Sequence, residues 1–283
     1  MDKVFRLLFT LILSVGLLSS CSMVESGREK ENNIAFDSLK VERTVHLMDK
    51  KENPACQIVL DFKYPSELTP KETLQKLQQF YLLSFFGEKY EQMDPQEAIA
   101  FYAEDYVADY KSLEADYTKD LKHATKEMPM GDWYSYYEHG ENSLVFNAQD
   151  IVSFQVSFEN YTGGAHPTHA YSNHTFCLNL GKGLDEEDLF VEDFQADLSK
   201  IIVDALVRQN ELKKPIELED IGFFSAEEIV PNENFLVKKD GLLYTYNEYE
   251  IAAYALGSID VFLPYGEIRH LFREDNPIAA LYL

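Results

Sequence analysis

Apolar and polar residues alternate with a period of two in several separate stretches, and this pattern restricts the fold more than any other feature of the sequence. Side chains along a strand point alternately to its two faces, so each stretch predicts a strand with one buried face. A weaker alternation over 39–47, followed by a polar segment, predicts that this stretch and the next form a β-hairpin or two neighbouring antiparallel strands. The clearest alternating residues are Cys56, Ile58, Leu60, Phe62 and Tyr64, and later Val152, Phe154, Val156 and Phe158.

Two helices are expected after these first strands. Residues 69–72 (Thr-Pro-Lys-Glu) have the form of a capping box with proline at the first helical position, and Gly87 marks the end of this helix. Residues 94–97 (Asp-Pro-Gln-Glu) begin a second helix, which we expect to end by Pro129. A stripe of tyrosines along it suits stacking on carbohydrate or packing on a sheet, and packing is the preferred interpretation. The stripe consists of Tyr102, Tyr106, Tyr110 and Tyr117.

The second half of the chain is richer in short strands. Along the whole chain, the expected order of strands, two helices, strands, a helix and further strands predicts an α+β fold with mostly antiparallel pairing. We expect a hairpin over 133–146 that turns at 138–141, strands over 152–158, 170–180, 235–237, 242–246 and 259–263, a turn at 182–183, and helices over 194–209 and 265–272.

The N-terminus has the pattern of an export signal. Lys3 and Arg6 precede an apolar run over 7–18, which is shorter than the roughly 20 residues that span a bilayer. The run ends in Leu-Ser-Ser-Cys, which resembles the lipobox of bacterial lipoproteins. We therefore predict a cleaved signal peptide at 1–20, lipidation of Cys21, a flexible tether over 21–37 and a place in the cell envelope, at the outer membrane. The alternatives are an uncleaved anchor and an ordinary signal with a chance cysteine.

The charge of the chain restricts its partners. Lys and Arg number 25 against 49 Asp and Glu, which gives a formal net charge of −24. Nucleic acids and anionic membrane surfaces require clusters of basic residues, so we expect neither as a partner. A basic partner suits this charge, and so does a simple role in solubility.

Two further cysteines, Cys56 and Cys177, could pair in an oxidising compartment. Cys56 alternates in phase with apolar neighbours, whereas Cys177 is out of phase with Phe176 and Leu178. We expect two separate thiols.

Three histidines fall close together in the sequence, at His166, His169 and His174. Such a cluster suggests zinc, and a metal-dependent envelope hydrolase using the His166 loop is one alternative function. Pro167 interrupts the segment and no HExxH pattern accompanies it, so we predict no metal and no cofactor. Gly163 and Gly164 are expected to allow a tight turn, with His166 fixing the loop.

Other catalytic patterns are weak. The sequence shows no GxSxG elbow, phosphate-binding loop or dinucleotide fingerprint. Glu138 and Glu141 could form a carboxylate pair for glycoside hydrolysis, but exposure on a hairpin tip is the simpler interpretation. We predict no catalytic residue and a protein that is not an enzyme.

Two groups of motifs resemble a known family. The first group contains YTGGAHP at 161–167, LGKGL at 180–184 and DLF at 188–190, and the second contains YEIAAYALG at 249–257 and VFLPY at 261–265. Together they resemble the RsiV-like extracytoplasmic domain, which we place at 151–283. Residues 38–150 resemble the companion domain that also forms the non-catalytic part of PdaC-type peptidoglycan deacetylases.

The resemblance implies an α+β domain that binds rather than catalyses. The best-understood members of the family are transmembrane anti-sigma factors whose outer domain binds lysozyme. This sequence lacks their cytoplasmic and transmembrane segments, so direct signalling is not expected, and it lacks the deacetylase domain. It also has Ala253 where a proline is common.

We therefore expect an envelope lipoprotein, held at the membrane through Cys21, whose folded part binds an extracytoplasmic ligand. The candidate binding residues are His166, Tyr254, Pro264 and Tyr265, expected on one surface; the alternative is that the tyrosines close the core. A lysozyme-like muramidase is the first candidate partner, because negative charge would steer a basic enzyme. Peptidoglycan or another glycan is the second.

Overall fold

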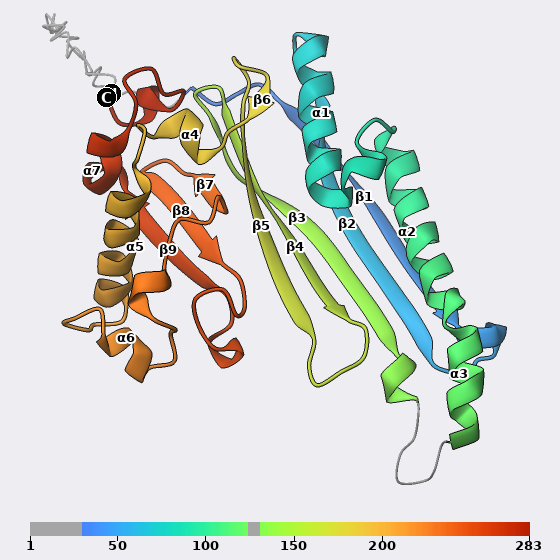
Figure 1. Ribbon diagram of the computed structural model, residues 1–283. Coiled ribbons are helices and arrows are strands. Elements are labelled where there is room, and N and C mark those ends of the chain that lie inside the picture. Colours follow the sequence, from blue (N-terminus) through green and yellow to red (C-terminus); the bar gives the residue numbers. More distant parts are fainter. Residues whose placement is uncertain (1–29, 124–130) are drawn as a thin grey trace, which may run out of the picture.

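The computed structural model describes residues 30–123 and 131–283 and has the expected α+β architecture (Figure 1). The signal peptide predicted at 1–20 and Cys21 lie outside the described residues. A six-stranded sheet has the order β1-β2-β3-β4-β5-β6, and a three-stranded sheet has the order β7-β8-β9. Within the described ranges, no helix is long and apolar enough to span a membrane.

The strands of the large sheet are β1 (Ala35–His46), β2 (Ala55–Glu67), β3 (Tyr136–Ala148), β4 (Ile151–Tyr161), β5 (Thr168–Cys177) and β6 (Lys182–Gly183). Those of the small sheet are β7 (Phe235–Val237), β8 (Gly241–Tyr246) and β9 (Ile259–Pro264). The helices are α1 (Lys71–Phe86), α2 (Pro95–Ser112), α3 (Glu114–Asp120), α4 (Glu186–Leu189), α5 (Gln195–Gln209), α6 (Glu217–Asp220) and α7 (Tyr265–Ile268).

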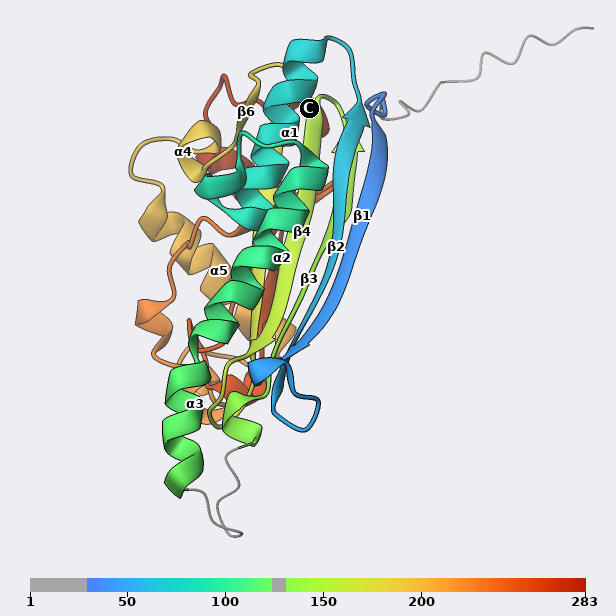
Figure 2. The same ribbon diagram turned by 90° about the vertical axis from the view of Figure 1, so that its right-hand side faces the viewer.

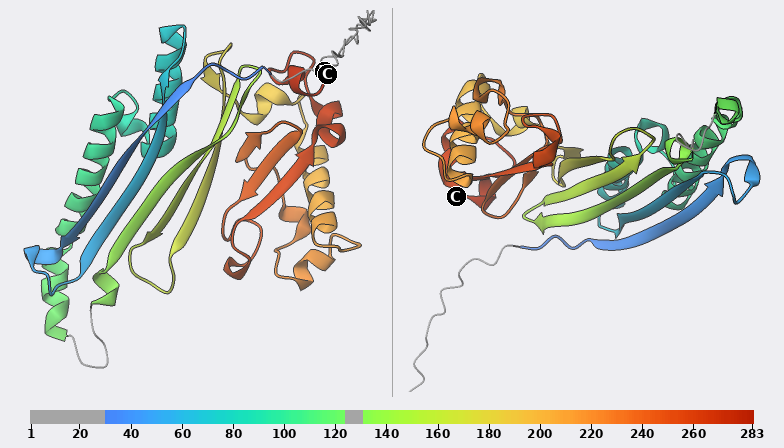
Figure 3. Two further views of the ribbon diagram at one scale, coloured as in Figure 1. Left: turned by 180° about the vertical axis from the view of Figure 1, so that it is seen from behind. Right: turned by 90° about the horizontal axis from the view of Figure 1, so that it is seen from below.

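Helices cover one face of the large sheet. β1 and β2 are antiparallel, as predicted, whereas β2 and β3 are parallel and are joined by the crossover through α1, α2 and α3. Figure 2 shows α1 and α2 lying along one face of β1–β4. In the right-hand view of Figure 3, α1–α3 lie on one side of the sheet and the opposite face of β1–β3 is left open. We call this the open face.

The alternating residues of β2 and β4 fill the core under the helices. Tyr81 of α1 stacks on Phe154 of β4 with ring centroids 3.8 Å apart, and both side chains are buried. The intervening residues of β2, such as Val59 and Asp61, face the open side. Other members of this core are Ile58, Leu60, Phe62, Leu77, Phe85, Val152, Val156 and Phe176.

The small sheet packs beside β4 and β5. Val237 of β7 donates its backbone N–H to the Thr175 hydroxyl of β5 at 3.2 Å. The amphipathic helix α5 lies against β9, and its buried residues Leu198, Ile202 and Leu206 join a second core with the small sheet. The two sheets and their helices are therefore in direct contact.

The structure confirms the two helices predicted after the first strands, but it confirms the predicted cap of only the second one. α1 ends at Gly87, which has a φ of 91°, but its N-cap is Pro70 and no side chain caps it, so the predicted box is not formed. Asp94 does cap α2, accepting from the Gln96 N–H at 2.8 Å. α2 ends at Ser112, and α3 continues the tyrosine stripe. Tyr110 and Tyr117 are buried, so the packing interpretation of the stripe is confirmed.

The hairpin predicted over 133–146 is wrong. β3 runs without a turn through 138–141, pairing with β2 on one side and β4 on the other. Gly140 sits in the middle of the strand because the Phe158 ring covers it: a Cβ at this position would lie 2.5 Å from Phe158 Cε1. Here the glycine allows close packing and does not form a turn.

Two predicted boundaries also shift. The division at 150–151 falls inside the β3–β4 hairpin, so it does not separate two structural units. The predicted tether reaches too far, because Glu31 already pairs with Ala148 and the Asn32 side chain donates to the Ile151 carbonyl at 2.8 Å. Residues 182–183, expected as a turn, form the short strand β6 beside β5.

Candidate functional site

Two of the sequence motifs meet at one end of the sheet. His166, in the turn between β4 and β5, stacks on Tyr254 with ring centroids 3.7 Å apart and an interplanar angle of 23°. Tyr249 lies beside both rings, at 5.6 Å from Tyr254 and 6.3 Å from His166. The Tyr254 hydroxyl donates to the Pro167 carbonyl at 2.9 Å, which ties the two segments together. We call His166, Tyr249 and Tyr254 the aromatic cluster.

The aromatic cluster is open to solvent. His166 is exposed, and 57% of Tyr249 is accessible. Its conformation has a local cause: Tyr249 has a φ of 68° and Gly257 a φ of 67°, so the segment turns sharply on both sides of the short helix η6 (Tyr254–Leu256). Exposed aromatic rings on a rigid scaffold are typical of binding surfaces.

Carboxylates lie next to the aromatic cluster. Partial desolvation and, next, the charge of Glu248 raise the pKa of the Tyr254 hydroxyl. Glu248 accepts from His169 at 2.9 Å, and Glu159 accepts from the Tyr137 hydroxyl at 2.7 Å. Desolvation and this bond raise the pKa of Tyr137 to about 12. The cluster is therefore bordered by negative charge.

Glu159 and His169, which lie near the aromatic cluster, also line a hollow on the open face. The hollow has a volume of about 430 Å³. Cross-strand pairing places His139 opposite Glu159, Glu159 opposite His169, and Asp61 opposite Glu141. These residues alternate with the buried ones, so the strand pattern that builds the core also lines up polar and acidic side chains on the other face. Its lining is Val59, Asp61, His139, Gly140, Glu141, Ser157, Phe158, Glu159, His169 and Tyr171.

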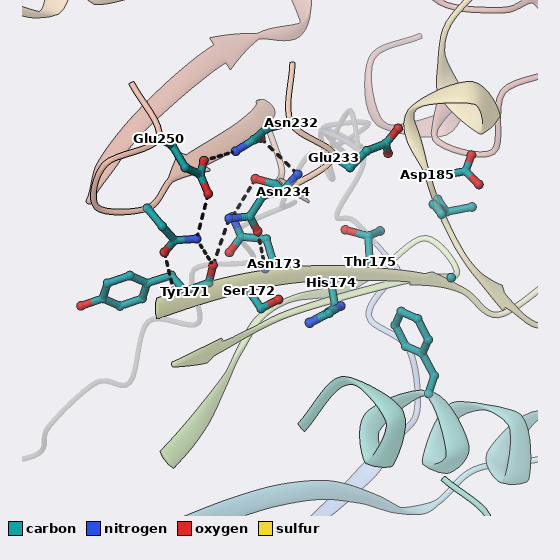
Figure 4. A pocket seen from close by; sticks show the side chains of 14 residues that line it. Tyr171, Ser172, Asn173, His174, Thr175, Asp185, Asn232, Glu233, Asn234 and Glu250 are labelled. Carbon is teal, nitrogen blue, oxygen red and sulfur yellow. Dashed lines mark hydrogen bonds between the residues drawn. The ribbon is translucent and has the colours of Figure 1, made fainter. Parts of the chain in front are cut away.

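The outer edge of β5 is closed by asparagine side chains (Figure 4). Asn234 accepts from the Asn173 N–H at 2.7 Å and donates to the Tyr171 carbonyl at 3.0 Å. Asn247 accepts from the Tyr171 N–H at 2.7 Å. These amides replace a neighbouring strand and hold the segment that leads to Tyr249 against the large sheet. A cavity of about 540 Å³, which also borders His174 and Asp185, lies along this edge.

The structure divides the predicted binding residues. His166 and Tyr254 come together, but Pro264 ends β9 and Tyr265 begins α7, at the opposite end of that strand. Tyr265 is 5% exposed, donates its hydroxyl to the Lys238 carbonyl at 2.7 Å and packs on Phe272 and Tyr282. The single surface expected from the sequence is therefore not formed, because Tyr265 closes the core.

The glycine turn is as expected. Gly163 has a φ of 88° and Gly164 a φ of 115°. Both lie in the region that side chains with a Cβ rarely adopt. A Cβ on Gly163 would also come within 2.9 Å of the Trp133 carbonyl oxygen, so this glycine lets the turn pack on the preceding segment.

The three histidines point to different places. His166 stacks on Tyr254, His169 bonds Glu248, and His174 lies on the helix-covered face against Phe154 with ring centroids 5.2 Å apart. Burial lowers the pKa of His174 to about 4. Across residues 30–123 and 131–283, no group of three or more His, Cys, Asp and Glu side chains could hold a metal ion.

The remaining candidates for chemistry are separated or buried. Glu138 accepts from the Tyr102 hydroxyl at 2.8 Å under the helices, and burial raises its pKa, whereas Glu141 is exposed on the open face. They do not form a carboxylate pair, because residues three apart on a strand face opposite sides. Cys56 and Cys177 are separate, buried thiols.

Several site residues were not singled out from the sequence. Tyr137, His139 and Glu159 occupy the polar positions of alternating strands, and a pairing register would have brought them together. Tyr249 lies within a recognised motif. Glu186 belongs to the acidic stretch 185–188, whose simplest interpretation from the sequence is a solvated turn. In the structure it is buried, and its backbone and carboxylate exchange hydrogen bonds of 3.1 Å with those of Glu233.

Two family models match separate parts of the chain. The family model described as "Deacetylase PdaC" matches residues 49–169, and that described as "Protein of unknown function (DUF3298)" matches residues 187–266. The first covers most of the large sheet and α1–α3, and the second covers most of the small sheet and α5. A comparison with curated proteins gave no match.

Solved structures share the fold over nearly the whole chain. A DUF3298 family protein from Pseudomonas aeruginosa is 14% identical and aligns with a TM-score of 0.58, covering 86% of this chain and 96% of that one. The crystal structure of a DUF3298 family member from Bacteroides fragilis aligns with a TM-score of 0.82. Since that relative is 30% identical over 89% of this chain and 97% of its own, the chain belongs to the DUF3298 family.

Proposed function

We propose that this chain is a non-catalytic binding protein of the cell envelope whose aromatic cluster docks a basic extracytoplasmic protein, in the first place a lysozyme-like muramidase. The observation that supports this most is the exposed stack of His166 and Tyr254 beside Tyr249. Tyrosine gives a large contact area with little side-chain entropy to lose, which suits a protein interface.

The charge around the cluster supports a basic partner. Glu159 and Glu248 border it, and Asp61 and Glu141 extend the acidic surface along the hollow of the open face. The whole chain has a net charge of −24. Such a field would speed the encounter with a cationic enzyme and weaken as salt screens it.

The hydrogen bonds of the cluster support a binding role over a catalytic one. The Tyr254 hydroxyl is engaged by the Pro167 carbonyl, and His166 Nδ1 lies 3.0 Å from the same oxygen. A general base needs a free nitrogen within reach of the group that it deprotonates. His166 Nε2 lies 3.4 Å from the Tyr249 hydroxyl, so the contacts of both ring nitrogens hold the parts of the aromatic cluster together.

Lipidation at Cys21 and exposure outside the cytoplasm are part of the proposal. They rest on the signal-like sequence of residues 1–21 and would place the binding surface where muramidases act. A glycan is the second candidate ligand for the same cluster, since stacked aromatic rings also suit a sugar face.

Calorimetry tests the proposal. The protein without its signal segment, titrated with basic lysozymes, should bind and should lose affinity steeply as salt rises. Purified peptidoglycan should give a weaker, salt-insensitive response. No heat with any lysozyme at about 100 μM, where a complex with Kd of ~10⁻⁴ M would be visible, would defeat the muramidase proposal.

A further inference from the structure

A further cavity, separate from the two described above, borders α3. Figure 1 shows α3 at the lower end of the molecule. The cavity measures about 600 Å³, within the usual range of small-molecule sites. Its described lining is Leu113, Asp116, Asp120, Trp133, Tyr134, Tyr136, Thr162, Gly163 and Gly164. The proposed function uses none of these side chains.

Trp133 is the main feature of this cavity. It is the single tryptophan of the chain, and 63% of it is exposed. An indole ring exposed to water loses the favourable free energy that burial of its large apolar surface would give. An exposed tryptophan that lines a cavity is therefore typical of a ligand-stacking surface. Tyr134 and Tyr136 add aromatic faces to the same cavity.

The polar groups of the cavity define the ligand further. Asp116 and Asp120 lie one turn apart on α3, and Asp120 accepts from the Tyr134 hydroxyl at 2.8 Å. Carboxylates are strong acceptors for ligand hydroxyl and N–H groups. Among the described residues of the lining two are acidic and none is basic, so this lining favours a neutral ligand over a phosphate or carboxylate.

The glycine turn borders the cavity. Gly163 packs on the Trp133 carbonyl, where a Cβ would clash at 2.9 Å, so the turn and Trp133 hold each other in place. A Cβ on Gly164 would meet no atom within 4 Å, which leaves the backbone there accessible to a ligand. The motif that carries His166 on one side therefore also borders this cavity.

We infer that this cavity binds a neutral saccharide, with a sugar ring stacked on Trp133 and its hydroxyl groups held by Asp116 and Asp120. In the described part of the lining, Leu113 is the one aliphatic residue, and the other large apolar surfaces are the aromatic rings of Trp133, Tyr134 and Tyr136. Aromatic faces and carboxylate acceptors are the combination that recognises a ring with one apolar face and polar edges.

Tryptophan fluorescence tests this directly, because every photon of indole emission comes from Trp133. The purified protein is titrated with a β-1,4-linked N-acetylglucosamine tetramer and, in parallel, with a β-1,4-linked glucose tetramer. A saturable change in emission with either saccharide is the expected result. No change with either, and no heat in calorimetry up to about 10 mM, overturns the inference.

Variants connect the signal to the cavity. In calorimetry, Trp133→Ala and Asp116→Asn should each weaken saccharide binding by about tenfold or more. Phe101→Ala, which removes a 49% exposed aromatic ring from α2, is the matched control and should bind as the wild type. Binding unchanged in Trp133→Ala would contradict the inference. Lysozyme binding should persist in Trp133→Ala, so this site and the proposed function fail independently.

Discussion

His166 and Tyr254 stack with ring centroids 3.7 Å apart, although they come from distant parts of the sequence. The contact joins the turn between β4 and β5 of the large sheet to η6 beside the small sheet. Both segments are held from behind, one by Gly163 packing on Trp133 and the other by the Asn247 amide on the edge of β5. The binding surface is thus a product of the way in which the two sheets meet.

Gly163→Ala should destabilise the protein more than Gly164→Ala. Both positions have positive φ and incur backbone strain, but only Gly163 would also place a Cβ 2.9 Å from the Trp133 carbonyl oxygen. We expect Gly163→Ala to lower the free energy of unfolding by about 2–3 kcal/mol and Gly164→Ala by about 1 kcal/mol. Urea denaturation measures both values. Equal losses would show that the packing on Trp133 is not the constraint.

Asn234→Ala should open the edge of β5. Its side chain bonds the Asn173 N–H, the Tyr171 carbonyl and the Thr245 carbonyl, so truncation leaves part-buried backbone groups without partners. A loss of about 2–4 kcal/mol is expected. Asn179→Ala removes one exposed bond to Asp150 and serves as the control, with a change below about 0.5 kcal/mol. Thermal or urea unfolding measures the loss of unfolding free energy in both variants. A loss for Asn234→Ala no larger than that for Asn179→Ala would contradict the edge-closing role.

Glu186 should make stability depend on pH near neutrality. Burial and, next, the charge of Glu233 raise its pKa from 4.5 to about 7. The folded state therefore retains a proton that the unfolded chain releases, and the resulting stabilisation is complete below about pH 4.5 and is lost as the pH rises through about 7.

Glu186→Gln is expected to remove this pH dependence, because the amide is neutral and its oxygen can still accept from the Glu233 N–H. Between about pH 5 and about pH 8, the wild type should lose roughly 2–3 kcal/mol of unfolding free energy relative to the variant. Glu192→Gln, at an exposed position whose charge is not among the causes of this shift, is the control and should follow the wild type. Parallel pH profiles for Glu186→Gln and wild type would show that Glu186 is ionised throughout.

Cys21 should carry lipid. Labelled palmitate is expected to enter the wild-type protein, and Cys21→Ala should abolish the label and release the protein from membranes, because stable attachment depends on the acyl chains. Cys56→Ala, at a buried thiol within β2, should leave labelling intact. Label retained in Cys21→Ala would sink the lipoprotein prediction.

The sequence pattern predicted most elements but not how they meet. Alternation identified β2, β4 and β9 because one face of each is buried, and Gly87 and Asp94 marked real helix ends. Gly140 was misread as a turn, since the Phe158 ring that requires it comes from another strand. Motifs identify His166, Tyr254 and the glycine turn. For Tyr265 the sequence leaves open a place on the binding surface or in the core, because spacing does not show on which side of β9 the core closes. That Glu141 and Glu159 lie on the same face could be predicted only with the register in which β3 and β4 pair.

The central claim, that the aromatic cluster is the docking surface, is tested most directly by calorimetric titration of a basic lysozyme into three proteins. The three proteins are the wild type, Tyr249→Ala and Phe262→Ala. The two variants replace side chains that are 57% and 41% exposed, so both should fold normally, and circular dichroism can verify this. The account predicts that Tyr249→Ala weakens binding by about tenfold or more while Phe262→Ala on β9 binds as the wild type. Equal affinities for all three proteins would contradict it.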